Sequence, residues 1–499
     1  MNDAAKAAGR LCRSALPALP PSVLRPGYDP AATRIGVVHF GPGAFHRVHQ
    51  AAFIDELLGR QPDWAISGVS LHSPAVRDAL RGQDGLYTLA VLGEQTTLRV
   101  IGSVRELLCA PQESAAVLTR LADPAVRLVT LTITEKGYCL AGEDLDFTHP
   151  EIVHDISAPA TPHSAIGYLV AGLAARRARG IAPFTVLSCD NLPGNGLRLR
   201  RAVLQYAQRT DPPLARWIES EAAFPCSMVD SITPATDEAL RERVSSGLGC
   251  RDAWPVQRER YSQWVIQDHF CNARPPFEQV GVTFSSDIAG YDRAKLRLLN
   301  GAHSTLAWLG SLLGLETVAD AMRVPALAGF VTRLMRESIL PVIAMPAGLD
   351  GCRYVEDILN RFRNPAIHHK LSQICWDSSL KVPARLLGTV SEALSQDRNI
   401  APLCLAIAGW LVFVRRQAQS GIALTDPLND SLSRIGRACA GEPRADIASF
   451  LELDGVFGQL AADARFAAAL HCAYAALGDG SPEALGKALA LSVPRQSAG

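Results

Sequence analysis

The chain has 499 residues, enough for two or three domains of roughly 150 residues each. Its 49 Lys and Arg residues balance 49 Asp and Glu residues, so the net charge gives no reason to expect a nucleic acid or an anionic membrane as partner. The best apolar run, residues 403–414, is shorter than the roughly 20 residues of a membrane helix. The N-terminus lacks an unbroken secretory core, and the twelve cysteines form no C-x-x-C pair. We therefore expect a cytoplasmic protein with buried thiols.

The first half of the chain alternates short apolar runs with helical stretches. Residues 34–40 predict a buried strand, a glycine-containing turn follows, and residues 50–58 have helical spacing. Further strands are predicted at residues 64–71, 126–133, 184–189 and 261–270, and further helices at residues 73–81, 114–122 and 164–179. Strands that alternate with helices predict a parallel sheet covered by helices on both faces.

After about residue 285 the pattern becomes helical. Helices are predicted at residues 293–313, 326–337, 400–419, 443–453 and 463–477. We therefore expect an α/β domain over residues 1–285 that opens like a dinucleotide-binding unit, and a mainly α-helical domain over residues 286–499.

Gly41 and Gly43 follow the first predicted strand, where a dinucleotide-binding site needs glycines for a tight turn and close approach to a pyrophosphate. The third glycine of the G-x-G-x-x-G pattern is absent, because His46 occupies that position. No acidic residue follows the second strand, where one usually binds a ribose hydroxyl. By itself the glycine pair fits a cofactor turn or a plain strand-to-helix turn equally well.

Lys295, Asn300 and His303 form a second candidate site. On a regular α-helix they fall at roughly 0°, 140° and 80°, on one side together with leucines. Polar groups on such a face are half-buried and need partners. Gly301 is unfavourable within a helix and indicates that another group approaches the backbone closely. The alternative is a solvated helix face with a stray glycine.

Residues 190–196 form a third candidate, because they follow the strand at residues 184–189 and ligands bind beyond the carboxyl ends of such strands. A metal site is not expected, because His368 and His369 are adjacent and no cysteine pair has ligand spacing. The motifs of α/β-hydrolases and of P-loop kinases are also absent from the sequence.

Short motifs of one family occur in order over most of the chain. They are Gly41–Gln50, Gln83–Thr88, Thr134–Tyr138, Cys189–Leu192, Met228–Pro234, Lys295–His303 and Lys381–Pro383. With these motifs the sequence resembles the mannitol dehydrogenase family, the polyol-specific long-chain dehydrogenases and reductases. The resemblance implies a Rossmann-type N-terminal domain, a mostly helical C-terminal domain and an active site between them.

The resemblance also implies roles for individual residues. It places NAD at the glycine loop, whose G-x-G-x-F-H form is normal for the family, and the expected cofactor contacts are Gly41, Gly43, Ala44, Phe45 and His46. In the active site it implies Lys295 as general base, Asn191 and Asn300 as the pair that holds the reacting oxygen, His303 as the residue that orients the hydroxyl, and Asp230 and Lys381 as substrate contacts.

Three positions depart from the family pattern. Asp292 stands where we expect a glutamate linked to proton exchange, and Gln373 stands where some mannitol enzymes have an arginine. The run Trp376–Ser379 replaces a more usual Asp-Gly pair. These changes predict a substrate pocket that differs from that of the mannitol enzymes.

The predicted chemistry is the oxidation of an alcohol without a metal. A lysine serves as the base if its pKa falls toward roughly 7 or 8, and two asparagine amides stabilise an alkoxide without adding charge. We expect an NAD-preferring dehydrogenase, with NADP not excluded, that acts on a polyol and its ketose, mannitol and fructose first. The alternatives are a fructuronate or tagaturonate reductase, and a catalytically silent protein that binds the cofactor. The oligomeric state is not predicted.

Overall fold

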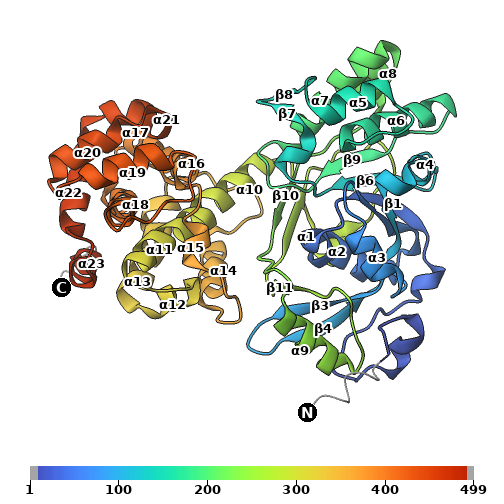
Figure 1. The fold of residues 1–499 in the computed structure, drawn as a ribbon, viewed down its shortest axis with the longest axis horizontal. Coiled ribbons are helices and arrows are strands. Elements are labelled where there is room, and N and C mark those ends of the chain that lie inside the picture. Colours follow the sequence, from blue (N-terminus) through green and yellow to red (C-terminus); the bar gives the residue numbers. More distant parts are fainter. Residues whose placement is uncertain (1–8, 492–499) are drawn as a thin grey trace. The chain divides into compact units, whose positions relative to one another are not determined.

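The computed structural model describes residues 9–491, which divide into two units: unit 1 ends at Ala289 and unit 2 begins at Gly290. Unit 1 combines a parallel sheet with helices, and unit 2 is almost entirely helical (Figure 1). This confirms the predicted fold class, an α/β Rossmann-type part followed by a mainly α-helical part. Among the described residues, no helix is both long enough and apolar enough to span a membrane.

Five parallel strands form the main sheet of unit 1, in the order β5-β2-β1-β6-β9. They are β1 (Ile35–Phe40), β2 (Ala65–Ser70), β5 (Val104–Cys109), β6 (Leu128–Leu131) and β9 (Thr185–Ser188). The chain runs from β1 outward through β2 to β5, returns to β6 on the other side of β1, and continues to β9. The strand order therefore reverses between β1 and β6. Open α/β sheets bind their ligands at this switch point, beyond the carboxyl ends of the strands.

Both faces of the sheet are buried. Neighbouring residues of a strand point to opposite faces, so each strand contributes side chains to two hydrophobic cores. Val38 and Val129 lie in the core beneath α4, α6 and α7, whereas Val37 and Leu128 lie in the core beneath α2. The helices of unit 1 are α1 (Ala44–Val48), α2 (Gln50–Leu58), α3 (Ala75–Arg81), α4 (Ala110–Leu121), α5 (Pro150–Ser157), α6 (Ala165–Ala178), α7 (Asn195–Thr210), α8 (Pro212–Glu221) and α9 (Glu238–Leu248).

Two three-stranded sheets complete unit 1, in the orders β11-β3-β4 and β10-β12-β13. Their strands are β3 (Tyr87–Leu92), β4 (Thr97–Ile101), β10 (Ser227–Asp230), β11 (Val256–Glu259), β12 (Gln263–Ile266) and β13 (Thr283–Phe284). Of these strands, only β12 was expected from the sequence. The strands β7 (Leu140–Ala141) and β8 (Asp144–Leu145) form a short hairpin.

Unit 2 is organised around α18 (Ala401–Gln419), which is buried along most of its length. Trp410 of α18 packs against Trp308 of α11, with ring centroids 6.2 Å apart. The unit contains α10 (Ile288–Ala294, which begins in unit 1), η7 (Lys295–Asn300), α11 (Gly301–Leu312), α12 (Val318–Arg323), α13 (Pro325–Arg333), η8 (Leu334–Ile339), α14 (Gly351–Arg363), α15 (Leu371–Ile374), α16 (Ser378–Val382), η9 (Pro383–Leu387), α17 (Gly388–Ser395), α18, α19 (Asn429–Ala438), α20 (Pro443–Leu451), α21 (Asp454–Phe457), α22 (Ala464–Leu477) and α23 (Pro482–Leu491).

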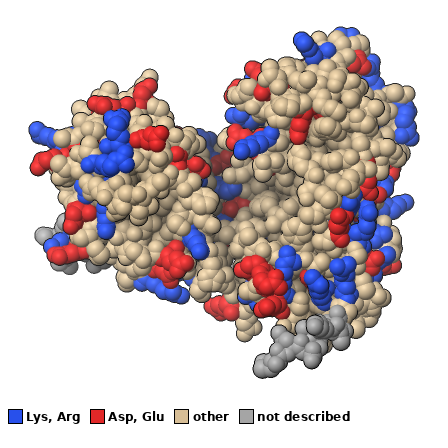
Figure 2. Space-filling view, viewed as in Figure 1, with Lys and Arg blue, Asp and Glu red and all other residues tan. Residues whose placement is uncertain are grey.

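Charged side chains of both signs are spread over each unit. On the face drawn in Figure 2, Lys and Arg side chains of the described residues are interspersed with Asp and Glu side chains. Some form surface ion pairs, such as Arg34 with Asp63 at 2.6 Å. Water and salt screen a surface pair of this kind, so these charges do little to hold the fold together.

Candidate active site

The predicted cofactor turn lies at the switch point of the main sheet. Gly41 directly follows β1, between the ends of β2 and β6, and its N–H donates to the Val69 carbonyl oxygen at 2.9 Å. Its φ of +87° and a Cβ position only 2.2 Å from the Thr132 carbonyl oxygen leave no room for a side chain. Gly41 is therefore a glycine because the backbone must turn within the sheet.

Gly43 has a different reason to be a glycine. It precedes α1, its N–H donates to the Gly41 carbonyl oxygen at 2.7 Å, and it is exposed. A Cβ at Gly43 would have no described neighbour closer than 3.9 Å, so the protein itself leaves this position open. An open backbone position at the switch point fits the close approach of a pyrophosphate.

The remaining predicted cofactor residues belong to α1. Ala44 begins the helix, and Phe45 stacks on His49 with ring centroids 5.0 Å apart. His46, which replaces the third glycine, is fully buried and stacks on His39 at 3.4 Å. Burial, followed by the neighbouring His39, holds the pKa of His46 well below its ordinary value. Neither ring nitrogen of His46 has a hydrogen-bond partner within the described part of the chain, so this imidazole is neutral.

The loop after β9 carries the predicted Asn191 and is anchored by its neighbour Asp190. The Asp190 carboxylate accepts hydrogen bonds from the backbone N–H groups of Ile133 and Thr134 and from the Tyr138 hydroxyl, at 2.7–3.1 Å. Burial raises the pKa of Asp190, and these three donors oppose that shift. The loop after β9 is thereby fixed to the loop after β6, and Asn191 itself is exposed.

Asp230 ends β10, where it pairs with Gln263 of β12, and it is buried. The start of β10 is tied to the end of β9 by Asn195, whose side-chain amide donates to the carbonyl oxygens of Asp190 and Ser227. Asn195 lies within the candidate segment of residues 190–196, but no pattern in the sequence indicated this function. It is a positioning residue for the two loops.

Lys295 to Asn300 form a π-helical turn, η7, between α10 and α11. The regular α-helical spacing expected for residues 295–303 is therefore wrong, because i→i+5 bonding widens the turn and rotates the side chains. A single π-turn inside an α-helix often marks a functional site. Gly301 follows the turn, and a Cβ there would lie 3.1 Å from the Arg385 carbonyl oxygen of η9. The expected close approach to Gly301 is thus made by the protein backbone.

His303 lies one turn further along, in α11, and is buried. Its ring stacks on Phe362 at 5.2 Å and meets His369 edge-on at 4.5 Å. Burial, and after it His369, holds the pKa of His303 well below its ordinary value. Among the described residues, its Nε2 atom has no hydrogen-bond partner. A neutral imidazole with a free nitrogen suits the predicted function of orienting a hydroxyl group.

Lys381 in α16 lies within electrostatic reach of His303. Its Nζ donates to the carbonyl oxygen of Ile374 at 3.2 Å and to that of Trp376. Burial, and then the charge of Arg385, lowers its pKa. The structure thus gathers His303 and Lys381 in unit 2, together with Lys295 and Asn300 on the turn before α11, and it places Asn191, Asp230 and the glycine turn in unit 1.

Asp292, which replaces the expected glutamate, is partly buried in α10 beside Lys295. Burial raises the pKa of its carboxyl to about 6, and the Lys295 charge opposes this shift. Because the folded state holds the proton more tightly than the unfolded chain, ionisation of Asp292 costs stability as the pH rises toward 6.

Asp292→Asn is therefore expected to raise the melting temperature above about pH 7 and to leave it unchanged below about pH 4. The gain in unfolding free energy at high pH is on the order of 3 kcal/mol. Thermal unfolding of both proteins across this pH range measures it. Asp430→Asn, at an exposed position of α19, is the control. If the melting temperatures of wild type and Asp292→Asn changed with pH in the same way, the pKa of the Asp292 carboxyl would not be raised in the folded protein.

Gln373 is exposed on α15. In the run that replaces the Asp-Gly pair, Asp377 adopts a left-handed conformation with φ of +52°. The next residue, Ser378, is buried, and its hydroxyl accepts a hydrogen bond from Trp308 Nε1 at 3.0 Å. In this run that departs from the family pattern, Ser378 thus packs in the core of unit 2.

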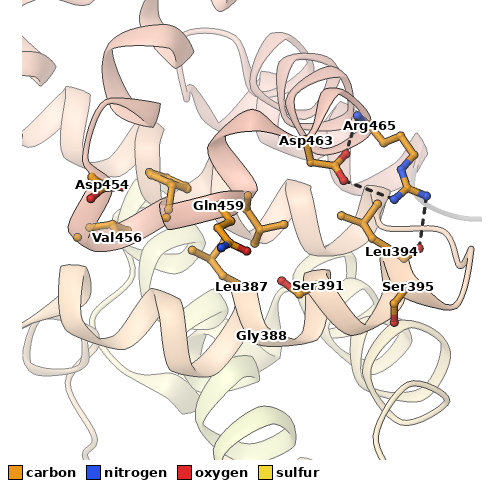
Figure 3. A pocket seen from close by; sticks show the side chains of 14 residues that line it. Leu387, Gly388, Ser391, Leu394, Ser395, Asp454, Val456, Gln459, Asp463 and Arg465 are labelled. Carbon is orange, nitrogen blue, oxygen red and sulfur yellow. Dashed lines mark hydrogen bonds and ion pairs between the residues drawn. The ribbon is translucent and has the colours of Figure 1, made fainter.

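A separate pocket of about 680 Å³ lies on unit 2 between α17, α21 and the start of α22. Figure 3 shows that Arg465 is directed toward Asp463 and the Leu394 carbonyl oxygen, so its charge is already paired. The other polar groups that line it include Ser391, Ser395 and Gln459. None of the predicted site residues lines this pocket.

Cys139, His149 and Glu151 form a cluster in which one ligand atom from each residue lies within 4.8 Å of the others. Burial and the nearby Glu151 raise the pKa of the Cys139 thiol to about 12.

Comparison with known proteins identifies the family to which the chain belongs. Residues 35–279 match the mannitol dehydrogenase Rossmann domain, and residues 287–478 match the mannitol dehydrogenase C-terminal domain. The D-mannonate oxidoreductase of Escherichia coli K12 is 39% identical over 91% of this chain and 95% of its own length. A mannitol 2-dehydrogenase of Neosartorya fischeri is 38% identical over 87% of this chain and 89% of its own.

Among solved structures, the mannitol 2-dehydrogenase of Pseudomonas fluorescens, in a ternary complex with NAD and D-mannitol, has a TM-score of 0.80 and 36% sequence identity. The match covers 97% of this chain and 100% of that chain. Both family domains match in order, and the similarity to these relatives extends over nearly their whole length. The chain therefore belongs to the mannitol dehydrogenase family of oxidoreductases.

Proposed function

We propose that this protein is an NAD-dependent dehydrogenase that oxidises a secondary alcohol of a polyol chain to a ketone. The observation that carries the proposal is the glycine turn of residues 41–43 at the switch point of a five-stranded parallel sheet. The lysine, asparagine and histidine of the family motif, Lys295, Asn300 and His303, lie on and just after the π-turn of unit 2. Relatives named for mannitol and for mannonate support a polyhydroxylated substrate.

Within this proposal, residues 1–285 hold the cofactor and residues 286–499 supply the general base. The glycine turn of residues 41–43 would hold NAD⁺, which would supply the acceptor for the hydride of the carbinol carbon. Lys295 takes the proton of the hydroxyl group, the Asn300 amide donates a hydrogen bond to the oxygen as negative charge develops there, and neutral His303 orients the hydroxyl. Asn191 is assigned to the same oxygen, and Asp230 and Lys381 are assigned to other parts of the substrate.

The test is a panel of polyols and polyhydroxy acids, assayed with NAD⁺ and NADP⁺ by the absorbance of the reduced nicotinamide. Turnover of at least one member supports the proposal. Cofactor binding without turnover of any member, in either direction, would identify a catalytically silent protein.

The cofactor preference is expected to favour NAD. β2 ends at Ser70 without an acid, but Glu151 of α5 lies 3.8 Å from the imidazole of His72, two residues beyond β2. A carboxylate at this position disfavours the 2′-phosphate of NADP. Glu151→Gln is expected to lower the kcat/KM ratio of NAD⁺ to NADP⁺ about fivefold, the effect of roughly 1 kcal/mol.

His72→Ala is the comparison variant, and it should not lower this ratio, because neutral alanine leaves the carboxylate in place. A wild-type enzyme that favours NADP⁺ by about tenfold or more, a difference of roughly 1.4 kcal/mol, would overturn the predicted preference.

A further inference from the structure

Arg385 of η9 lies beside the candidate catalytic residues of unit 2. Its Nη1 donates to the Ser304 hydroxyl at 2.8 Å and to the Asn300 carbonyl oxygen at 3.4 Å. Nη1 makes both bonds, and they hold the guanidinium group against the end of the π-turn. Ser304 directly follows His303 in α11. The electrostatic influence of Arg385 on His303 agrees with this position.

Among the described residues, the Arg385 guanidinium has no acidic partner. Within residues 9–491, no carboxylate lies within ion-pair distance of it, and burial alone lowers its pKa to about 10. Arg297 of η7 shows the contrasting case, because Glu392 of α17 binds both of its terminal nitrogens at 2.6 and 2.8 Å. A largely buried guanidinium without a carboxylate is costly unless a ligand supplies the negative charge.

A second cation lies near Arg385. The charge of Arg385 reaches Lys381, whose ammonium group donates to the carbonyl oxygens of Ile374 and Trp376. Arg361 of α14 is buried and acts on His303 together with Lys381 and Arg385. Asp377 and Asp426 offset the charge of Lys381 in part, but the Asp426 carboxylate is bound to Ser379.

We propose that Arg385, with Lys381 beside it, binds a carboxylate of the substrate, so that the polyol oxidised here is a polyhydroxy acid and its product a keto acid. A guanidinium group binds a carboxylate through two parallel hydrogen bonds, which a neutral hydroxyl group cannot match. The remaining donors of Arg385 supply this geometry while Nη1 stays on Ser304. This inference rests on the proposed function, because it names the substrate class of the same site.

The experiment compares D-mannonate with D-mannitol as substrates of the wild type, Arg385→Gln, Arg385→Lys and Arg297→Gln. The wild type is expected to prefer mannonate by tenfold or more in kcat/KM, about 1.4 kcal/mol. Arg385→Gln should lower the mannonate-to-mannitol ratio by about a hundredfold, chiefly through the KM for mannonate, because a charge-assisted bidentate pair is lost. Arg385→Lys should recover part of that ratio as a point charge.

Arg297→Gln is the matched control, because it removes an arginine of the same unit that already has its carboxylate. It is expected to lower the melting temperature and to keep the mannonate-to-mannitol ratio. Binding of mannonate to the cofactor-free variants, measured by thermal shift, gives a readout that does not depend on turnover.

Three results would overturn the inference. They are a wild type that prefers mannitol, an Arg385→Gln variant that loses both substrates equally, and a mannonate-induced thermal shift that is the same in wild type and Arg385→Gln. In each case turnover of some polyol would leave the proposed function standing. Absence of turnover with the whole panel would instead remove the proposed function.

Discussion

Lys295→Ala is expected to lower kcat for polyol oxidation by a factor of about 100 or more, the usual contribution of a general base. The hydroxyl group must lose its proton before or as the hydride leaves, and the alanine variant lacks the amine at the start of η7 that would accept this proton. In the wild type, the oxidation rate should rise with pH as the base loses its own proton. Steady-state rates and single-turnover rates of the purified variant measure the effect.

NAD binding should change little in Lys295→Ala, because the glycine turn belongs to unit 1. Lys370→Ala, at an exposed position just before α15, is the matched control and should keep both activity and cofactor binding. If Lys295→Ala retained more than about a tenth of kcat, a loss below roughly 1.4 kcal/mol, Lys295 would not be the base.

Gly41→Ala and Gly43→Ala are expected to fail in different ways. The Gly41 backbone has a positive φ, and a Cβ would meet the Thr132 carbonyl oxygen at 2.2 Å, so alanine must displace the end of β1 from β6. We expect the cofactor-free Gly41→Ala variant to unfold at a lower temperature, with a loss of about 1–3 kcal/mol or more from backbone strain, and to bind NAD weakly.

Gly43→Ala should keep the melting temperature of the wild type, since no described atom lies closer than 3.9 Å to the new methyl group. Its affinity for NAD should nevertheless fall about tenfold or more, because the methyl group would occupy the space into which the pyrophosphate comes. Thermal unfolding and NAD titration separate the two effects. Gly59→Ala, after α2, is the control, because it has an ordinary φ and nothing within 4 Å. Normal NAD binding by Gly43→Ala would show that the cofactor does not approach this turn.

Several strands of the main sheet could be predicted because they are buried on both faces. β1, β2, β6 and β9 consist of nearly continuous apolar or small residues, which is the pattern of a central parallel strand. The edge strand β5 was missed, because Arg105 and Glu106 interrupt its apolar pattern. Glu106 is satisfied there by Ser67 and Arg120 at 2.6–3.0 Å, an arrangement that local sequence does not reveal.

The candidate site was likewise only partly predictable from the sequence. The sequence by itself determined the glycine turn and the residue types of the Lys295–His303 motif, because both are local patterns set by what a short backbone segment must do. The π-turn was not predictable, because an i→i+5 helix leaves no distinct spacing of apolar residues and is stabilised by packing against η9. Only the tertiary structure brought Arg385 to Ser304, 81 residues apart in the chain, and showed that no carboxylate accompanies it among the described residues. Whether a buried charge has a partner depends on the folded surroundings of that charge, and a linear pattern of residues does not contain this information.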